Sequence, residues 1–550
     1  MAGSAPKTAD GPVKPDYNIA DAYVPADLGA QDWLIIAPIA LTIIAGSILL
    51  ILRKKTDLQA PLAIASLVLL VLFDFQLLLW VAAEGPQSMT MGRWLPPFGI
   101  SFTVDVLGAL LSFVAAVIAL LAAVFASREI GWAGKRYGFY PFLLLLMTGV
   151  SGSFLTGDIF NLYVWFEVLL IASFGLLVLG SEKLQLDGAI KYSFLNLIAT
   201  TLFLIATGYV YGVFGTLNMA DITVKATALA NSADSKAPLV TIAALYFLAF
   251  GMKAAAFPVN FWLPASYHTP RIVVQAIFAG LLTKVGIYAF VRTLSMVFGG
   301  LVFGSITTTL ADIMAVIAAL TMVLAGFGAL AQDDVRRLSG YVVISGIGMM
   351  MAGIAMNTSV SLTAMTAYAV HSMVTMTALY MVLGLAGSLA GSFSMRKMGG
   401  LYATNPFLSA LFLILVFAVA GLPPFSGFWP KLQLVRSGLE TGYPWLVAAI
   451  LFTGFLTTIA LGRVWAHGFW RGGQSGTPDG TLALDHIGTS SDAALFSKMT
   501  LTPVALLVVA SVILGIFAEP LMVMSEKAAA SLLDPQPYIR SVFPDLTNEK

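Results

Sequence analysis

The chain has 550 residues, of which 59% are hydrophobic and only 10% are charged, and its mean hydropathy is +0.89. Soluble domains carry about 25% charged residues, so this composition excludes an ordinary soluble globule and indicates a membrane protein. The 29 basic and 28 acidic residues nearly cancel, which leaves no net field to attract nucleic acid. Because the chain has no cysteine, it cannot hold a disulfide, a cysteine-ligated iron–sulfur cluster or a cysteine nucleophile.

Fourteen apolar runs are candidates for membrane-spanning helices, each of which takes about 20 residues. They lie near 33–52, 59–83, 100–127, 138–156, 158–180, 189–213, 237–262, 272–295, 307–331, 341–357, 361–389, 404–437, 444–470 and 500–525. The first run ends in Arg53-Lys54-Lys55, which predicts that it enters the cytoplasm and that the N-terminus lies outside. If the helices alternate, sixteen of the 29 basic residues fall inside, ten, including Arg292, fall outside, and three remain within the spans. We therefore expect an all-α polytopic membrane protein with both termini outside.

Several polar segments flank or connect these runs. Residues 1–32 carry no basic stretch ahead of a short apolar run, so a removable signal peptide is not expected. Residues 214–236 are predicted as an outside loop, 471–499 as a cytoplasmic linker and 526–550 as a C-terminal tail. None of them is large enough for a soluble catalytic domain, so the membrane part must carry the function.

Four charged side chains within the spans are candidates for that function, namely Glu167, Lys253, Lys284 and Lys431. A charge at mid-bilayer costs about 2.5–3.5 kcal/mol, so each needs a partner, a water-filled cavity or a functional role. The alternative, purely structural roles are an ion pair for Glu167, snorkelling for Lys253, helix packing for Lys284 and interfacial anchoring for Lys431. Prolines follow Lys253 and precede Lys431, and they predict broken helices with freed carbonyls at both places. Such interruptions in two halves of a carrier point to a transport site.

The chemistry that suits these residues is proton and ion movement. Making and breaking a pair between Glu167 and Lys253 would switch the lysine between its charged and neutral forms. His371, inside an apolar run, also titrates near neutral pH, although a lone histidine in a helix is often only hydrogen-bonded. Asp105 lies near a helix start and is interpreted as structural, whereas no motif supports a role for Asp74.

Other chemistries find little support in the sequence. No Walker-type phosphate loop occurs, and His268 has no neighbouring ligands in the sequence. We therefore expect no cofactor, no metal and no enzymatic activity.

Several motifs carry a family resemblance. They are Gly157–Leu170 (GDIFNLYVWFEVLL), Lys253–Pro258 (KAAAFP), Phe261–Pro270 (FWLPASYHTP), Phe278–Tyr288 (FAGLLTKVGIY), Gln332–Leu338 (QDDVRRL) with Tyr341 and Ser345, His371–Met373 (HSM), and Gly421–Lys431 (GLPPFSGFWPK). Over about residues 100–440 the chain resembles the D subunits of Mrp-type multisubunit sodium/proton antiporters. The wider family includes the antiporter-like L, M and N subunits of respiratory complex I.

The resemblance implies fourteen transmembrane helices with helices 7 and 12 broken. It implies helices 1–3 over 33–127, two inverted five-helix repeats over 138–295 (helices 4–8) and 307–470 (helices 9–13), and helix 14 over 500–525. It further implies that Glu167, Lys253, Lys284 and Lys431, with His371, form a polar axis that carries protons. The implied function is exchange of cytoplasmic sodium for external protons in a bacterial inner membrane, with other hydrophobic subunits, sodium ions, protons and lipid as partners and no nucleic acid.

The chain departs from the family pattern at two places. Many relatives carry a lysine shortly after the helix 11 histidine, where this chain has Thr375 and Met376, so a relay there would use His371, Ser372 or water. Complex I subunits commonly have a histidine where this chain has Asn260, which favours the Mrp branch. Two alternatives remain, a proton-pumping subunit of a redox complex and a scaffold whose buried charges only hold helices together.

Overall fold

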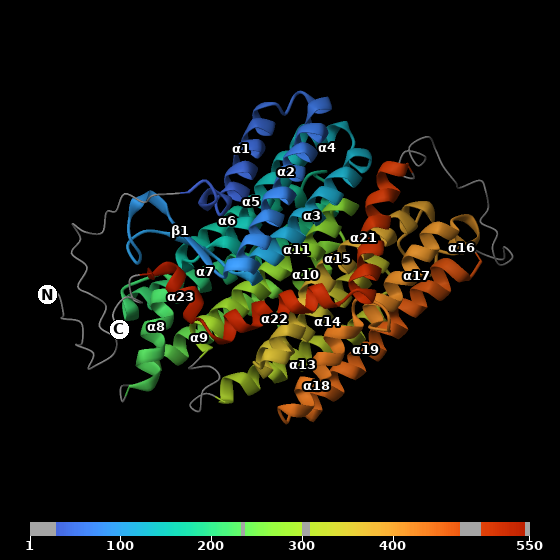
Figure 1. Ribbon diagram of the computed structural model, residues 1–550. Coiled ribbons are helices and arrows are strands. Elements are labelled where there is room, and N and C mark those ends of the chain that lie inside the picture. Colours follow the sequence, from blue (N-terminus) through green and yellow to red (C-terminus); the bar gives the residue numbers. More distant parts are fainter. Residues whose placement is uncertain (1–28, 233–236, 300–307, 473–496, 545–550) are drawn as a thin grey trace.

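Helices form almost all of the computed structural model, which describes residues 29–232, 237–299, 308–472 and 497–544 (Figure 1). The first half contains η2 (Asp32–Leu34), α1 (Ala37–Ile51), α2 (Thr56–Glu84), β1 (Gln87–Thr90), η3 (Met91–Arg93), β2 (Ser101–Val104), α3 (Val106–Glu129), α4 (Trp132–Tyr137), α5 (Phe139–Leu155), α6 (Ile159–Leu177), α7 (Lys183–Phe214), α8 (Met219–Asn231), α9 (Ala237–Ala254), α10 (Trp262–Tyr267), α11 (Ile272–Val291) and η4 (Arg292–Val297). The second half contains α13 (Thr308–Ala331), α14 (Val335–Met356), α15 (Ser359–Leu389), α16 (Leu401–Thr404), α17 (Pro406–Ala420), α18 (Phe428–Glu440), α19 (Pro444–Val464), η5 (Trp465–Trp470), α21 (Lys498–Ile516), α22 (Glu519–Leu533) and α23 (Gln536–Val542).

Among the described residues, eleven helical segments are long and apolar enough to cross a membrane, and α1, α5 and α17 are shorter apolar helices. This confirms the predicted helical membrane fold. The number of fourteen spans and the inverted repeats stay predictions. The predicted N-terminal segment over 1–32 and the linker over 471–499 lie almost entirely outside the described residues.

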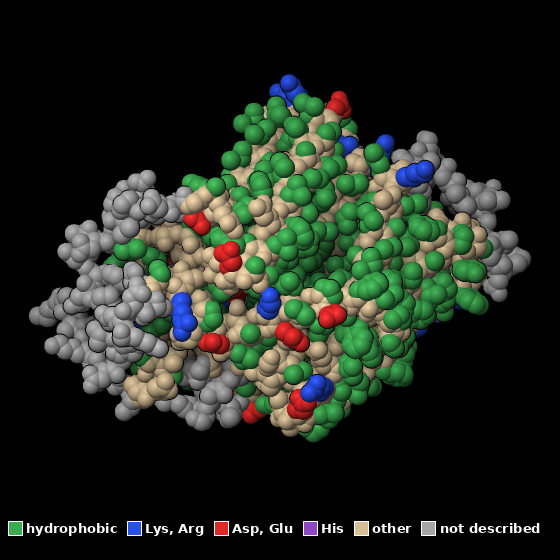
Figure 2. Space-filling model, viewed as in Figure 1, with side chains coloured by type: hydrophobic (Ala, Val, Ile, Leu, Met, Phe, Trp, Pro, Cys, Tyr) green, Lys and Arg blue, Asp and Glu red, His purple; other side chains and the backbone are tan. Residues whose placement is uncertain are grey.

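The helices are sorted by burial. In the spans built on α11 and α15 every residue of the most apolar window is buried, against only 33% in α2 and 39% in α7. The outer helices therefore turn leucine, isoleucine and phenylalanine outward, as lipid contact requires. Figure 2 shows this apolar surface between charged side chains near the α1–α2 loop and a second charged band along α22. The centre of the bundle is where polar side chains are out of contact with both water and lipid.

Side-chain caps explain where several spans begin. Asp105 accepts a hydrogen bond from the Gly108 amide at the start of α3 (3.0 Å), and Asp158 accepts one from the Asn161 amide at the start of α6 (2.8 Å). Each side chain satisfies one of the amides that the first turn of a helix leaves free. Asp334, Thr358 and Asn405 cap α14, α15 and α17 in the same way.

Two spans are interrupted at the predicted prolines. The run over 237–262 consists of α9 and an irregular segment around Pro258, and the short helix α10 begins at its last residue and continues to Tyr267. The run over 404–437 consists of α17, a break at Gly421–Gly427 and α18. The end of α9 is buried, whereas the break after α17 is exposed at residues 422–424. In both, the last carbonyls of the first half-helix need partners other than the next helical turn.

The structure also corrects several boundaries. The run over 100–127 begins with β2, which pairs antiparallel with β1, because Asp105 starts the helix only at residue 106. The outside loop predicted over 214–236 contains α8. The helix predicted over 500–525 is divided at Phe517 into α21 and α22, since Pro520 lacks the amide that would continue the first helix and instead starts the second. The residues predicted as a tail continue α22 and form α23, and α22 runs across the bundle towards α8 (Figure 1).

Candidate functional site

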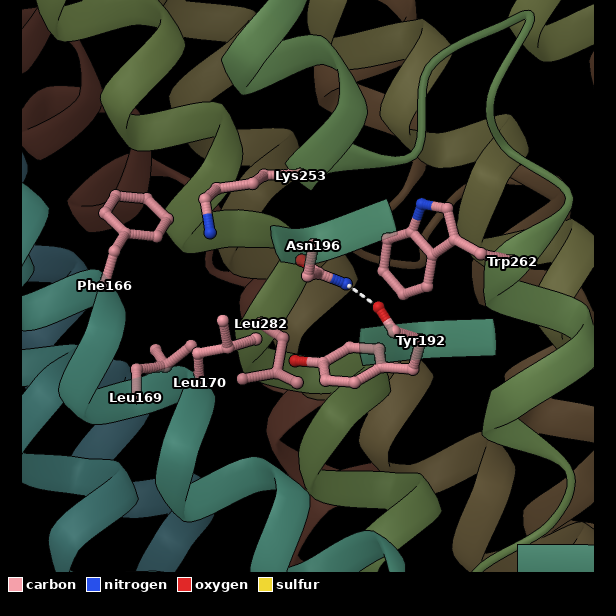
Figure 3. Close-up of a pocket in the computed structure, with 8 residues that line it drawn as sticks. All are labelled: Phe166, Leu169, Leu170, Tyr192, Asn196, Lys253, Trp262 and Leu282. Atoms are coloured by element: carbon pink, nitrogen blue, oxygen red, sulfur yellow. Dashed lines mark hydrogen bonds between the residues drawn. The ribbon is translucent and has the colours of Figure 1, made fainter. Parts of the chain in front are cut away.

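Lys253 lies in the last turn of α9, and 6% of its surface is exposed. Its Nζ atom is 4.7 Å from the centroid of the Phe166 ring on α6. Figure 3 shows the lysine pointing towards a small cavity, whose lining is completed by Leu169, Leu170, Tyr192, Asn196, Trp262 and Leu282. The water-accessible volume of this cavity is about 10 Å³, close to that of one water molecule.

Glu167 lies next to Phe166 in the sequence but does not form the expected ion pair. Among the described residues, no carboxylate oxygen lies within 4.0 Å of the Lys253 ammonium, and the half-buried Glu167 has one oxygen, Oε1, without a hydrogen-bonding partner. The carboxylate is nevertheless within electrostatic range of Lys253. The aromatic face of Phe166 therefore contacts the cation, and Glu167 acts on it from a greater distance. Sequence reasoning missed this because it paired charges and ignored the adjacent ring.

The break after Lys253 is held by side chains from other segments. The Trp262 indole donates to the carbonyl of Met252 (3.1 Å), and the Phe257 amide donates to the Thr321 hydroxyl on α13 (3.0 Å). These contacts pair backbone groups that the proline interruption removes from the helical ladder. Thr321 is 64 positions from Phe257 in the sequence, so no local pattern indicated it.

Lys284 is buried in the middle of α11 and donates to the carbonyl of Ala279 on its own helix (2.7 Å). Glycines on either side of it let other helices approach. A Cβ atom on Gly280 would lie 2.2 Å from the Thr377 hydroxyl on α15, and one on Gly286 would lie 3.0 Å from the Ala254 amide at the end of α9. The predicted close packing is confirmed, and it brings α11 against both the Lys253 and the His371 helices.

His371 is buried on α15, where its Nδ1 atom is 2.7 Å from the Ser426 hydroxyl. Ser426 belongs to the break between α17 and α18, and its hydroxyl is also 3.0 Å from that of Ser511 on α21. Lys431 and Lys284 both lie within electrostatic range of the imidazole. The histidine is thus hydrogen-bonded, as a purely structural role would require, and it is also within electrostatic range of both lysines.

Lys431 lies in the first turn of α18 and donates to the carbonyls of Val419 (2.7 Å) and Ala420 (2.9 Å). Those carbonyls end α17, and Gly421 follows them with a φ of +82°. The carboxyl end of a helix carries partial negative charge, which favours a nearby cation. Lys253 is at the equivalent end of α9, so each broken helix places a lysine at the carboxyl end of its first half.

The five predicted residues therefore lie along connected helices. Glu167 on α6 is within electrostatic range of Lys253 on α9, Lys284 follows on α11, and His371 and Lys431 follow on α15 and α18. Their side chains are separated by more than direct contact, so protons crossing this row would need hydroxyls or water between them. Among the described residues, no three histidine or acidic side chains cluster as metal ligands would.

Asp105 and Arg292 form an ion pair that is not predicted from the sequence. Arg292, assigned to an outside loop, is buried and forms two 2.7 Å hydrogen bonds with Asp105. The structural interpretation of Asp105 is confirmed, while the position of Arg292 is corrected. The sequence could not reveal this pair, because its members are 187 positions apart.

His268 lies outside the spans, after α10. Its Nδ1 atom is 2.8 Å from the Pro264 carbonyl and its Nε2 atom is 3.2 Å from the Arg337 guanidinium on α14. Burial and the charge of Arg337 lower the pKa of His268 to about 4. This histidine is therefore neutral at physiological pH and joins two segments.

The geometry can be compared with known proteins. Residues 156–457, which contain all five predicted site residues, match the family described as NADH:quinone oxidoreductase/Mrp antiporter, TM. The chain is 36% identical to the D subunit of the Na(+)/H(+) antiporter of Alkalihalophilus pseudofirmus, over 93% of this chain and 99% of that relative. It is 34% identical to the D subunit of the Na(+)/H(+) antiporter of Bacillus subtilis, over 92% of this chain and 99% of that relative.

The fold is also similar to that of chains in solved membrane complexes. A chain of the Mrp complex from Dietzia sp. DQ12-45-1b has a TM-score of 0.84 and 27% identity, covering 94% of this chain and 100% of that chain. A chain of respiratory complex I from Thermus thermophilus, at 22% identity and a TM-score of 0.73, covers 91% of this chain and 100% of its own length and shares the fold. With a family match over more than half of its length and relatives above 30% identity along most of it, the chain belongs to the NADH:quinone oxidoreductase/Mrp antiporter family.

Proposed function

We propose that this protein is one subunit of a multisubunit antiporter that exchanges cytoplasmic sodium for external protons across a bacterial inner membrane. The observation that carries the proposal is the row from Glu167 through Lys253, Lys284 and His371 to Lys431, which connects the two broken helices. Its three middle members are buried and its two end members are half-buried. Ionisable groups inside a membrane are costly and are retained for ion or proton pathways. The relatives named as D subunits of Na(+)/H(+) antiporters support sodium as the exchanged cation.

In this proposal the row of five residues carries protons, and the two helix interruptions hold the charged side chains of Lys253 and Lys431. Glu167 tunes the charge of Lys253 across the Phe166 ring, and Lys284 passes the proton on towards His371 and Lys431. Ser426 orients the imidazole, and the carbonyls of Val419 and Ala420 receive the Lys431 ammonium. Thr375 and Met376 fill the place where many relatives have a lysine, so the second half depends on His371. The two inverted repeats over 138–295 and 307–470 belong to this proposal, because they would relate the two breaks.

The apolar outer surface and the separated charged bands support a multi-pass position with other hydrophobic subunits as neighbours (Figure 2). The Mrp complex that contains a similar chain supports the same arrangement. We place the α1–α2 loop with Arg53-Lys54-Lys55 in the cytoplasm, since basic loops remain inside. Both termini then lie outside. We also propose that the chain is a secondary transporter subunit without enzymatic activity.

Cation-induced dequenching of a pH-sensitive dye in everted vesicles tests the function. The complete complex is compared with complexes carrying Glu167→Gln or Lys253→Ala, with sodium, lithium and potassium added in turn. We expect each variant to lose sodium-dependent exchange by roughly tenfold or more, because the first half of the row is interrupted. Lys54→Ala removes an exposed lysine from the α1–α2 loop and should retain exchange.

Two alternatives make different predictions in the same assay. A scaffold role predicts that both variants exchange normally whenever the complex assembles, and that result would end the assignment of transport to these residues. A proton-pumping subunit of a redox complex predicts proton movement that depends on an electron donor and not on sodium. A structural similarity supports testing this redox alternative. A chain of an archaeal respiratory membrane complex has 25% identity and a TM-score of 0.80, covering 94% of this chain and 100% of that chain.

A further inference from the structure

Asp74 is an ionisable residue inside a span that the proposed axis does not use. It lies on α2, where Leu70 and Leu77 are fully buried while Leu72 and Phe75 face outward, and its own exposed fraction is 0%. Neither carboxylate oxygen has a hydrogen-bonding partner among the described residues. The hydroxyl of Ser112 on α3 faces the carboxylate outside ideal hydrogen-bonding geometry. Asp74 also lies outside the residues that match the family, 156–457.

The level of Asp74 in the bundle follows from contacts between neighbouring helices. Phe75 packs against Phe113 with ring centroids 5.4 Å apart, which fixes α2 against α3. The ion pair between Asp105 and Arg292 fixes α3 against α11. From that pair, Ser112 lies seven residues along α3 and Lys284 eight residues back along α11, which is about 10 and 12 Å at 1.5 Å per residue. Asp74, Ser112 and Lys284 are therefore at nearly the same depth.

Two more helices contribute unpaired hydroxyls to this layer. The Tyr140 hydroxyl donates to the carbonyl of Ala123, and a Cβ on Gly108 would meet the Phe154 carbonyl, so the register of α3 against α5 puts Ser112 and Ser151 at the same level. Ser151 and Thr283, which is next to Lys284, are both fully buried. The hydroxyls of Ser112, Ser151 and Thr283 all lack hydrogen-bonding partners among the described residues.

This arrangement is unusual for the interior of a membrane protein. A buried polar group without a partner costs about 1–3 kcal/mol, and four such groups occupy one layer between α2 and α11. The elements packed against α2 are η2, α1, α3, α4 and α5, and none of their described charged side chains, including Lys135 and Arg136 on α4, is within electrostatic range of Asp74. A carboxylate there has no fixed counter-ion among the described residues. A bound proton is the smallest ligand that removes the cost of the buried charge. Hydroxyls both donate and accept hydrogen bonds, which is what transfer of a proton along a row requires.

We propose that Asp74 is a further proton-binding residue, and that Ser112, Ser151 and Thr283 form a lateral branch from it to Lys284. The branch rests on the proposed antiport function. It joins the row at its centre from the side of α2, separately from Glu167 and Lys253. In each transfer the carboxyl O–H bond breaks, a hydroxyl accepts the proton as it releases its own to the next oxygen, and the Lys284 amine receives the last proton.

The test compares Asp74→Asn with Asp57→Asn in the complete complex. Both changes remove a carboxylate from α2, but Asp57 is exposed at its first turn. We expect Asp74→Asn to reduce sodium-dependent proton exchange about tenfold and to change its pH profile, whereas Asp57→Asn leaves both unchanged. Asp74→Glu should restore part of the rate. Native gel electrophoresis checks that each complex assembles, and Ser112→Ala provides a second variant that keeps the carboxyl group and should slow exchange.

Normal rates and an unchanged pH profile in assembled Asp74→Asn and Ser112→Ala complexes would overturn the branch. Infrared difference spectra recorded on acidification separate this result from failure of the antiport proposal. A carboxylic-acid band that responds to pH in the native complex and disappears in Asp74→Asn supports proton binding even if the complex exchanges no sodium. A spectrum identical in the two complexes contradicts proton binding at Asp74.

Discussion

The lysines at the two breaks are each held by uncharged groups. Lys431 donates to two carbonyls at the end of α17, and Lys253 lies over an aromatic ring at the end of α9. Desolvated cations of this kind depend on accurate placement, because carbonyl and ring contacts weaken steeply with distance. Small changes beside the lysines should therefore affect transport more than stability.

Gly421→Ala tests the placement of Lys431. Gly421 has a φ of +82°, and a Cβ atom there would lie 2.6 Å from Cδ of Lys431, so the substitution must displace the lysine. The left-handed backbone alone costs a non-glycine residue about 1–2 kcal/mol. Gly442→Ala is the matched control, since it has a φ of +78° and no atom within 4 Å of the added methyl. We expect both variants to lower the melting temperature similarly, but only Gly421→Ala to lose most sodium-dependent exchange; equal exchange rates would contradict the prediction.

His268 predicts a pH dependence of stability outside the membrane. Its pKa is about 4 in the folded protein against an ordinary value of 6.5, so the unfolded chain binds the extra proton more readily. The contribution of His268 is therefore complete above pH 6.5 and is lost as the pH falls towards 4. Between these pH values, the melting temperature of the complex should fall more steeply with decreasing pH for the native protein than for His268→Gln. Parallel curves would show that the lowered pKa of His268 does not affect stability.

At the scale of elements, the packing of α11 between α9 and α15 determines how the row is spaced. Gly280 and Gly286 allow the close approach, and Lys284 lies between them on the same helix. Any widening of the α11–α15 contact would lengthen the distance between Lys284 and His371. The spacing of proton carriers is thus an outcome of backbone contact between helices.

Gly280→Ala should separate these two helices. The added methyl would lie 2.2 Å from the Thr377 hydroxyl, and overpacking of this kind costs about 1–3 kcal/mol. The double variant Gly280→Ala/Thr377→Ala removes the opposing hydroxyl and should recover much of the melting temperature and exchange. Gly212→Ala, on α7 with no atom within 4 Å of the new methyl, is the control. If the double variant were no better than Gly280→Ala, the contact with Thr377 would not be the cause.

The sequence alone predicted those elements that depend on neighbouring residues along the chain. Apolar runs predicted the spans, and Pro258 and Pro423-Pro424 predicted the breaks beside Lys253 and Lys431. It failed where partners are distant or where an apolar run changes direction. Ser426 and Ser511 meet at His371 from separate segments, and the run ending near 525 hides the turn at Phe517. The missing Glu167–Lys253 contact has a similar cause, since helix rotation and not composition places Phe166 against the lysine.

At the scale of the whole molecule, one buried cluster joins segments from both ends of the chain. Arg292 pairs with Asp105 at the start of α3, donates to the Tyr288 hydroxyl (3.2 Å) and lies 5.4 Å from the ring of Tyr538 on α23. Helix α22 reaches this cluster after packing along α15 and α3 (Figure 1). The cluster therefore holds the C-terminal helices against the first half of the protein.

Arg292→Met is expected to destabilise the complex strongly, because Asp105 would remain as a buried charge without its partner, at a cost of about 3–5 kcal/mol. Replacing both members in Asp105→Asn/Arg292→Met removes the unpaired charge and should regain part of the lost stability. Melting temperature and protease cleavage between α21 and α23 measure the effect. Additive losses in the double variant would indicate that the pair is not energetically coupled.

The row of site residues has an electrical consequence for the molecule. It contains three lysines, one glutamate and one histidine, and the hydrogen bonds of Lys431 go to uncharged backbone carbonyls. A lysine without a fixed counter-ion can lose its proton without stranding an opposite charge, and its neighbours then experience less repulsion in a medium that screens poorly. Protonation at one lysine should therefore disfavour protonation at the next. Such anticooperative filling would make a charge added at one end of the molecule displace a charge at the other, over a distance that no side chain spans.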